Sequence, residues 1–326
     1  MIITRTPLRI SIGGGGTDLP SFYEREGGFV ISAAISKYIY IGINPIFVDD
    51  YVLKYSELER VASVDDIAHP LIREALRMHE IEPGVEIMSL ADIPAGTGLG
   101  SSASFTVGLL RALYAYQRDH VTQWTLAEEA SRIEIELLDE PVGKQDQYIA
   151  SFGGLTCFEF APDGSVAVSP LRISNETLHD LEENLLMFFT GYARSAVTVL
   201  EDQRVRSQAG DTEMLDNLRF IKNTGREIAK VLEAGEVEQF AGLMHEHWMR
   251  KRERSGSMTN ETIDGWYDFA MRNGALGGKL VGAGNGGFLL FYARDRDALR
   301  RALVEAGLTE VRFTFDHDGS VVSVRA

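Results

Sequence analysis

A glycine-rich stretch in the first third of the chain reads Pro94-Ala95-Gly96-Thr97-Gly98-Leu99-Gly100-Ser101-Ser102-Ala103. The residues that follow, from Phe105 to Tyr114, carry apolar side chains at the spacing of one helix face. Glycines let the backbone approach an oxyanion closely, and a helix start adds unpaired N–H donors and the positive end of the helix dipole. We therefore predict that this loop and helix bind an anion, with phosphate as the natural candidate.

A helix can also begin after glycines without binding anything, and the loop alone leaves that alternative open. The paired serines Ser101 and Ser102 favour phosphate binding, because one hydroxyl can cap the helix while the other reaches a phosphate or a divalent cation. No lysine follows Gly100, so the stretch differs from the common P-loop. Other residues must then supply the positive charge.

The composition is that of an acidic globular protein. The chain has 326 residues, of which 44% are hydrophobic, enough for two domains or one large domain with a buried core. Its 32 lysines and arginines stand against 48 aspartates and glutamates, which gives a formal net charge of −16. This charge disfavours nucleic acid or an anionic membrane as a partner. A small anionic substrate could still bind at a local cluster of donors.

The single cysteine, Cys157, excludes an intramolecular disulfide and a zinc-type cysteine cluster. We expect it to be a buried strand residue, because it lies in an apolar run. No apolar run approaches membrane-spanning length and the first residues lack a signal-like apolar core, so a cytoplasmic location is expected. The sequence is compatible with a homodimer and does not define the oligomeric state.

The N-terminal half is predicted to pack helices on a mixed sheet. Period-two alternation and β-branched or aromatic residues predict strands at 7–12, 28–35, 38–43, 85–89 and 155–160. Helical spacing appears over 64–79 and 125–138. After a turn at 162–164 the composition shifts toward long helices, predicted at 215–233, 236–254 and 261–272, with strands at 185–189 and 288–292.

Another glycine loop follows the first predicted strand, where residues 13–16 are all glycine and lead to Thr17 and Asp18. Glycine weakens a strand end, so this design favours a ligand that the backbone approaches closely. A hairpin loop in which Asp18 caps the next helix is the alternative. Further along, Asp146 lies among amide side chains after a helix, and its local sequence alone favours an ordinary turn aspartate.

The last glycine loop, residues 277–287, formally contains a G-x-G-x-x-G pattern at Gly282, Gly284 and Gly287. A strand follows it instead of a helix, which disfavours a dinucleotide-binding fingerprint. We predict a loop between two strands that closes over a ligand. In the helix before it, His245 and His247 are two residues apart and face different sides, so they make a poor metal pair.

The three loops together resemble the GHMP family of small-molecule kinases. The family's central signature, Pro-x3-Gly-Leu-Gly-Ser-Ser-Ala, is matched by Pro94 and residues 98–103. Its final signature, Lys-x-x-Gly-Ala-Gly-x-Gly-Gly, is matched by Lys279 and residues 282–287. The resemblance implies an α+β, two-domain GHMP kinase fold, with a ribosomal protein S5 domain 2-like domain at 1–175 and a ferredoxin-like domain at 176–326. The active site would lie between them.

Sugar-kinase members of this family share two further motifs. The first is Pro-x-Arg followed by Thr-Asp, and here it is matched by Pro7, Arg9, Thr17 and Asp18. The second is a helical glutamate followed by Pro-x-Gly-x-x-Asp-Gln, matched here by Glu134, Pro141, Gly143, Asp146 and Gln147. This context reverses the local interpretation of Asp146.

The resemblance implies ATP and Mg²⁺ as cofactors and assigns roles to these residues. Asp146 would accept a proton from the attacking sugar hydroxyl or orient it, and Arg9 would stabilise charge on the γ-phosphoryl group. Ser102 and Glu134 would hold Mg²⁺, while Pro94 and residues 96–103 would cradle the ATP phosphates. The expected substrate-binding residues are Gly15, Gly16, Thr17, Asp18, Gln145, Arg194, Gly284 and Gly286.

The substrate is expected to be a phosphorylated sugar, because the loops look most like those of the heptose 7-phosphate kinase branch. Galactokinases carry Gly-Glu-His before Thr-Asp, whereas residues 14–16 are glycines here. The branch phosphorylates the anomeric hydroxyl of D-glycero-D-manno-heptose 7-phosphate, for GDP-heptose and surface polysaccharide. The candidates for binding the 7-phosphate are Arg194, Lys251, Arg252 and Lys37.

Two alternatives remain. A fucokinase-like or other sugar-1-kinase activity would use the same residues on a different sugar. A non-catalytic sugar-binding regulator would share the fold, but the joint presence of Arg9, Ser102, Glu134 and Asp146 disfavours it.

Overall fold

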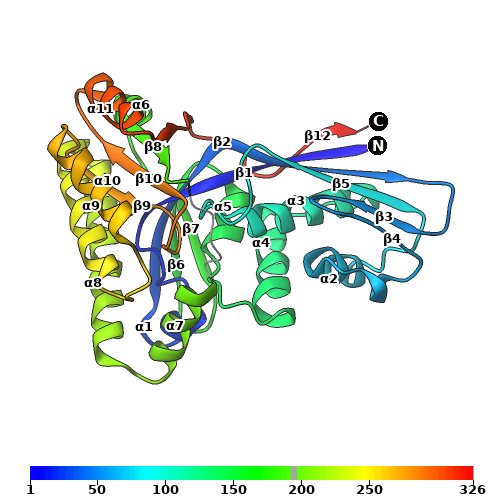
Figure 1. Cartoon of the computed structure of the whole chain (residues 1–326). Helices are drawn as coiled ribbons and strands as arrows, with labels where there is room; N and C mark the ends of the chain where they lie inside the picture. The colour runs from blue at the N-terminus through cyan, green and yellow to red at the C-terminus, as the bar shows by residue number, and fades with distance from the viewer. Residues whose placement is uncertain (192–196, 326) are drawn as a thin grey trace.

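The computed structural model describes residues 1–191 and 197–325. Helices and two sheets make up the chain, and the long strands β1 (Ile2–Gly13) and β2 (Gly28–Pro45) cross its middle (Figure 1). The larger sheet has the order β12-β1-β2-β5-β3-β4, and β6 and β7 continue it from the first half of β2. Its other strands are β3 (Tyr51–Lys54), β4 (Leu58–Val61), β5 (Val85–Ala91), β6 (Leu155–Phe160), β7 (Val166–Pro170) and β12 (Val321–Arg325).

The smaller sheet is antiparallel and belongs to the C-terminal half, with the order β11-β8-β10-β9. Its strands are β8 (Leu185–Phe189), β9 (Gly277–Leu280), β10 (Phe288–Tyr292) and β11 (Thr309–Glu310). Residues 281–287 connect β9 to β10, so the predicted loop between two strands is confirmed. The C-terminal strand β12 returns to the larger sheet beside β1, which brings the two chain ends together (Figure 1).

The helices of the N-terminal half are α1 (Pro20–Glu26), α2 (Pro70–Met78), α3 (Ser101–Tyr116), α4 (Gln123–Ser131) and α5 (Gln145–Phe152). Those of the C-terminal half are α6 (Asn175–Asn184), α7 (Val197–Gln208), α8 (Thr212–Glu233), α9 (Val237–Arg252), α10 (Glu261–Arg272) and α11 (Arg296–Glu305). Helix α3 packs on β1 and β2, and α8 packs on the same two strands as well as on α9. Helix α9 in turn packs on β9, so α8 and α9 connect the two sheets.

Three local predictions need correction. The strands predicted at 28–35 and 38–43 are one strand, β2, whose pairing with β1 shifts register at Ser36 and Lys37. The helix predicted over 64–79 is a 3₁₀ turn (Val64–Asp66) followed by α2, because the residue before Pro70 is held in an extended conformation. The helix predicted over 125–138 changes from α4 to a π-helical segment, Arg132–Leu137.

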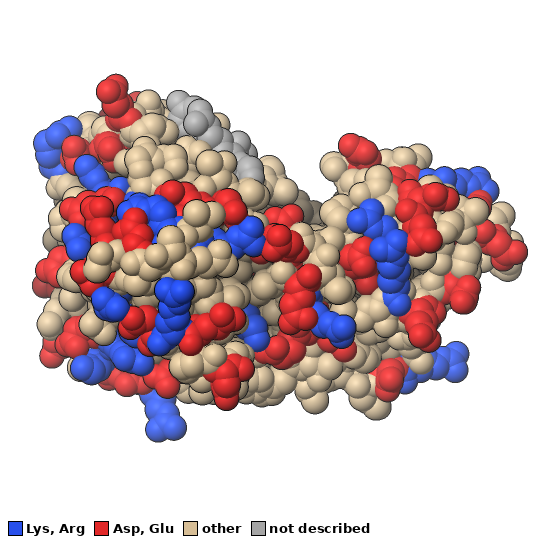
Figure 2. Space-filling view, turned by 90° about the horizontal axis from the view of Figure 1, so that it is seen from below, with Lys and Arg blue, Asp and Glu red and all other residues tan. Residues whose placement is uncertain are grey.

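The surface carries charges of both signs (Figure 2), and the single cysteine is buried. Acidic and basic side chains are interspersed over the face in Figure 2, without a broad basic area there. None of the described helices combines the length and the apolar character that a membrane crossing requires. Cys157 is a buried residue of β6, and burial raises the pKa of its thiol to about 12.

Phe240 of α9 should be a major contributor to stability, because its side chain is 0% exposed in the core between α9 and β10. Phe240→Ala is expected to lower the free energy of unfolding by about 3–5 kcal/mol, the usual range for a buried phenylalanine. Phe47→Ala removes the same atoms from a fully exposed position and is the matched control. Urea denaturation of both variants measures the difference, and equal losses would contradict this account of the core.

Candidate active site

A cavity of about 800 Å³ lies where the glycine-rich loops meet. The loop before α3, the loop after β1 and the loop between β9 and β10 all contribute to its lining, together with residues of α5, α7 and α9. The three motifs, which are far apart in the sequence, therefore line one site.

The loop before α3 has the conformation that an anion-binding loop requires. Gly96, Gly98 and Gly100 have φ of 76°, 80° and 76°, and α3 begins immediately afterwards at Ser101. A Cβ on Gly98 would lie 3.0 Å from the carbonyl oxygen of Val281, so the loops before α3 and after β9 are in contact. The buried Ser101 hydroxyl has no hydrogen-bond partner among the described residues, which leaves a donor at the helix start.

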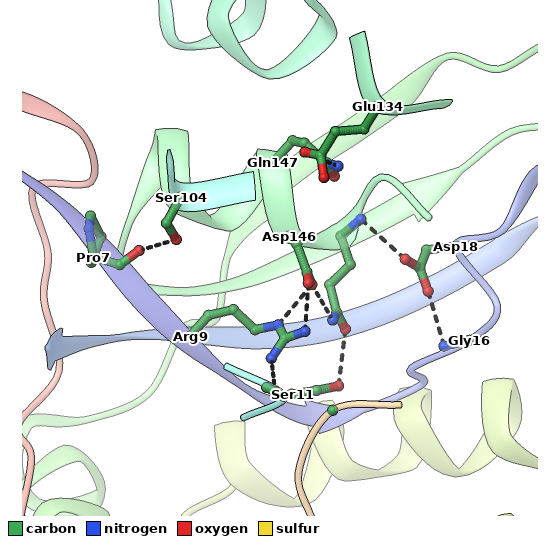
Figure 3. A network of polar contacts seen from close by, with 12 residues as sticks. Pro7, Arg9, Ser11, Gly16, Asp18, Ser104, Glu134, Asp146 and Gln147 are labelled. Carbon is green, nitrogen blue, oxygen red and sulfur yellow. Dashed lines mark hydrogen bonds and ion pairs between the residues drawn. The ribbon is translucent and has the colours of Figure 1, made fainter. Parts of the chain in front are cut away.

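Arg9 of β1 connects this loop to Asp146 at the start of α5 (Figure 3). Its Nε donates to Oδ1 of Asp146 at 2.7 Å and its Nη2 to Oδ2 at 2.6 Å, while Nη1 donates to the carbonyl oxygen of Gly98 at 2.5 Å. A two-pronged guanidinium–carboxylate contact of this kind fixes both orientation and position. The basic and acidic groups are therefore held together beside the glycine loop.

Asp18 lies next to this pair in the same cavity. Its Oδ1 accepts from the backbone N–H of Gly16 at 2.9 Å, and its Oδ2 accepts from the backbone N–H of Gln145 at 3.1 Å (Figure 3). The Gln145 side chain accepts from the Ser11 hydroxyl at 2.9 Å and donates to Oδ1 of Asp146 at 2.9 Å. Burial, together with the charge of Asp146, raises the pKa of Asp18.

Glu134 comes from the π-helical segment, a rare conformation that often occurs at functional sites. Its carboxylate is buried and accepts from the amide nitrogen of Gln147 at 2.9 Å, while Oε1 of Gln147 has no partner among the described residues. Burial raises the pKa of Glu134 to about 7, and hydrogen bonds from Gln147 and Ser102 oppose the rise. Carboxylate, amide and hydroxyl oxygens so close together fit a Mg²⁺ ion, which prefers oxygen ligands.

Buried cations gather on the side of the cavity formed by the C-terminal half. Lys251 donates to the carbonyl oxygen of Gly282, and Arg254 donates through Nη1 to the side chain of Gln203 at 2.8 Å. Lys279 donates to the carbonyl oxygen of Ile12 at 3.2 Å, and burial, with the nearby charges of Arg9 and Arg254, lowers its pKa to about 7. Burial lowers the pKa of Arg254 to about 10, so this side chain is charged at neutral pH.

Apolar and aromatic residues line the cavity on the side of β5 and α2. The ring of His69 stacks on Phe105 with centroids 5.0 Å apart, and Tyr55 meets His69 edge-on at 4.7 Å. These residues form a wall suited to a flat ring. Their role was not predictable from the sequence, because an aromatic residue in or beside a strand or helix is most often part of a core.

Most of the predicted site residues line the cavity: Arg9, Gly15, Gly16, Asp18, Gly96, Gly98, residues 100–103, Glu134, Gln145 and Asp146. Thr17 is not among the lining residues, and its hydroxyl donates to the carbonyl oxygens of Gly14 and Phe29. Pro94, Thr97, Leu99, Gly284 and Gly286 are likewise absent from the lining. Their predicted roles are not tested by these contacts.

The cations considered for a substrate phosphate are distributed unevenly. Arg194 lies outside the described residues. Lys251 lines the cavity, whereas Lys37 and Arg252 do not, and Arg252 is ion-paired with Asp264 at 3.6 Å. Arg254 and Gln203 also line the cavity, although the sequence motifs did not predict either of them as a site residue. The helix predicted at 236–254 would have placed Arg254 on the same face as Lys251, which was the signal available for Arg254. In the structure α9 ends at Arg252, and Arg254 lies in the turn that follows.

Two lobes of α+β structure place three glycine-rich loops around one cavity, which suits a small molecule that carries phosphate groups. The chain belongs to the GHMP kinase family: the model of the GHMP kinases N terminal domain matches residues 64–154, and that of the GHMP kinases C terminal matches residues 228–308. The α+β, two-domain GHMP fold is thereby confirmed. As a member of this family the chain is an ATP-dependent kinase.

Individual relatives extend the similarity over nearly the whole chain. The chain is 30% identical over 303 residues to the D-glycero-alpha-D-manno-heptose 7-phosphate kinase of Campylobacter jejuni, covering 89% of each protein. It is 26% identical to the bifunctional fucokinase/GDP-fucose pyrophosphorylase of Arabidopsis thaliana, covering 94% of this chain and 31% of that protein. The crystal structure of a D-glycero-D-manno-heptose 1-phosphate kinase from Bacteriodes thetaiotaomicron superposes with a TM-score of 0.81 at 24% identity, covering 100% of each chain.

Proposed function

We propose that this protein transfers the γ-phosphoryl group of ATP to the anomeric hydroxyl of D-glycero-D-manno-heptose 7-phosphate. The product is the 1,7-bisphosphate, an intermediate toward GDP-heptose for capsule or surface polysaccharide. The observation that carries the phosphoryl-transfer proposal is the Arg9–Asp146 pair, fixed between the glycine loop and the Asp18–Gln145 group in one cavity. The 30% identity to a heptose 7-phosphate kinase over 89% of the chain supports the choice of sugar.

The residues present fit both proposed cofactors. The loop from Pro94 to Ala103 would hold the ATP phosphates, with α3 presenting its N-terminus to them. The wall containing Tyr55, His69 and Phe105 would receive the adenine ring. Ser102 and Glu134 would hold Mg²⁺, which, when bound, neutralises part of the phosphate charge.

In this mechanism Asp18 and Gln145 orient the sugar, and Asp146 takes the proton of the anomeric hydroxyl. The oxygen then attacks the γ-phosphorus, the bond to the β–γ bridging oxygen breaks, and ADP leaves. Arg9 stabilises the charge that accumulates on the transferring group, because its guanidinium contacts both Asp146 and the loop carbonyl of Gly98. Arg9 thereby supplies positive charge at the γ-phosphoryl group, which a lysine supplies in a P-loop and which this loop lacks.

The domain limits remain part of the proposal, with the N-terminal kinase domain at 1–175 and the C-terminal domain at 176–326. The strand β12 is an exception to this division in space, because residues 321–325 pair with β1.

A fucokinase-like activity is the second candidate, and the similarity to the Arabidopsis fucokinase favours it. Purified protein with Mg-ATP should be assayed for ADP release with heptose 7-phosphate, fucose and galactose. We expect kcat/KM to be highest for heptose 7-phosphate. A higher kcat/KM for an unphosphorylated sugar would refute the substrate choice. If none of the three sugars leads to ADP release, the result would support the non-catalytic alternative.

Gly143 provides a test of the sugar-orienting group. A Cβ at this position would lie 2.0 Å from Oδ2 of Asp18, so Gly143→Ala must displace that carboxylate. We expect kcat/KM for the sugar to fall by about 10²-fold, the effect of misplacing a positioning group by roughly 1 Å, with KM for ATP unchanged. The control is Gly265→Ala in α10, where a Cβ has open space. An unchanged kcat/KM in Gly143→Ala would argue against Asp18 as a sugar ligand.

A further inference from the structure

The buried cations around the cavity are not balanced by the carboxylates near them. Lys251 and Arg254 are each only 5% exposed, and Asp18 is the carboxylate whose charge acts on both. The oxygens of Asp18 already accept backbone N–H groups of Gly16 and Gln145, and among the described residues Asp18 forms no ion pair with either cation. Burial and the charges of Lys279, Arg254 and Arg9 together hold the pKa of Lys251 well below its usual value. An anion bound among these groups would balance the buried positive charge and would raise the pKa of Lys251 again.

Arg254 also retains an unused donor. Its Nη1 donates to Gln203 at 2.8 Å and its Nε to Asn217 at 3.2 Å, so α7 and α8 hold the guanidinium in place. Its Nη2 is buried and has no hydrogen-bond partner among the described residues. A buried guanidinium nitrogen without an acceptor is costly unless a ligand supplies one. Because Arg254 lines the cavity, that ligand would be the cavity's occupant.

The contacts of Arg254 place it on the far side of Asp18 from the phosphate-transfer groups. On one side, Oδ2 of Asp18 accepts a hydrogen bond from the backbone N–H of Gln145, whose side-chain amide donates to Asp146. On the other side, Oδ1 of Asp18 accepts a hydrogen bond from the backbone N–H of Gly16. A Cβ added to Gly16 would lie 2.5 Å from Nη1 of Arg254, so these two residues are in contact. Gln203, which accepts from Arg254, also donates to the carbonyl oxygen of Gly16 at 2.7 Å. The order across the cavity is therefore Asp146, Asp18 and Arg254.

We propose that Arg254, assisted by Lys251, binds the phosphate group that the sugar substrate already carries. The proposal rests on the proposed function. A sugar whose anomeric carbon faces Asp146 and whose ring hydroxyls face Asp18 extends its distal phosphate toward Arg254. Lys251 lies between the two phosphate positions, since it contacts Gly282 of the loop packed on Gly98 and is influenced by both Arg9 and Arg254. The side chain of Arg254 donates to Gln203 and Asn217, neither of which belongs to these two loops.

The test compares phosphorylated and unphosphorylated forms of one sugar, heptose 7-phosphate and heptose, in the wild type and in Arg254→Gln. We expect the variant to raise KM for heptose 7-phosphate by about 10–100-fold, the effect of losing a charged hydrogen bond. The KM for ATP should stay unchanged, and the kcat/KM for unphosphorylated heptose should fall much less than that for heptose 7-phosphate. The matched control is Arg250→Gln, an arginine in the last turn of α9 that is paired with Glu253 outside the cavity, whereas Arg254 follows the end of that helix.

Equal losses with both sugars, or a raised KM for ATP, would overturn the assignment, because Arg254 would then serve the fold or the ATP phosphates. Failure of the wild type to phosphorylate either sugar would instead refute the proposed function. Arg254→Lys covers the case in which Arg254→Gln does not fold, since lysine keeps the charge and loses the planar fork. For it we expect a smaller rise in KM, about tenfold, again much larger for the phosphorylated sugar than for the unphosphorylated one.

Discussion

Replacing Asp146 with asparagine is expected to lower kcat by about 10³-fold, within the range for loss of a general base. Asparagine keeps the size of the side chain and one acceptor, so Arg9 retains one of its two contacts with residue 146. It cannot take the proton of the sugar hydroxyl. Binding of ATP should persist, because the phosphate loop does not depend on the charge of residue 146. Steady-state ADP release and equilibrium nucleotide binding measure the two effects.

The control for this variant is Asp49→Asn, which removes an exposed carboxylate from the loop after β2. It should behave as the wild type. A kcat within a few fold of the wild type in Asp146→Asn would show that proton transfer does not involve this residue. Loss of nucleotide binding would show instead that Asp146 serves mainly to hold Arg9.

Replacing Arg9 with alanine is expected to lower kcat by roughly 10³-fold or more, the range for an arginine that stabilises phosphoryl-transfer charge. The change removes the guanidinium from between Asp146 and the carbonyl oxygen of Gly98. Arg9→Lys should recover only a small part of the rate, because one ammonium group cannot reproduce the two-pronged contact with Asp146. Rates at saturating ATP and sugar give the comparison.

Added guanidinium ion offers a further test of Arg9→Ala. If the lost rate reflects the missing charge, the ion should enter the vacated space and raise kcat, while leaving the control Arg312→Ala, an exposed position, unaffected. A loss of rate that follows a loss of melting temperature, without rescue, would make Arg9 a structural residue of β1.

The sequence was sufficient to predict those parts of the site in which a motif determines the local backbone geometry. The glycines at 96, 98 and 100 predicted an anion loop before a helix, and their positive φ values agree with that. The family signatures also predicted that Arg9, Asp18 and Asp146 would meet, and the cavity brings them together. These predictions succeeded because backbone freedom and chemically committed residue types leave a strong pattern in the sequence.

The remaining features depend on packing between distant segments. Gln203 and Arg254 meet because α7 and the turn after α9 both approach the loop after β1, and no local pattern encodes that contact. The strand β12 was missed because its pairing partner, β1, lies at the other end of the chain. The change from α4 to π-helix at Arg132 leaves the apolar spacing nearly intact, so periodicity could not reveal it.

The most direct test of the account is the identity of the product. Purified protein should be incubated with Mg-ATP and heptose 7-phosphate, and the product followed by phosphorus NMR. We expect one new phosphate resonance, coupled to the anomeric proton, that grows in step with ADP and forms about 10³-fold more slowly with Asp146→Asn. A new phosphate at any other hydroxyl, or no bisphosphate beside rapid phosphorylation of an unphosphorylated sugar, would contradict it.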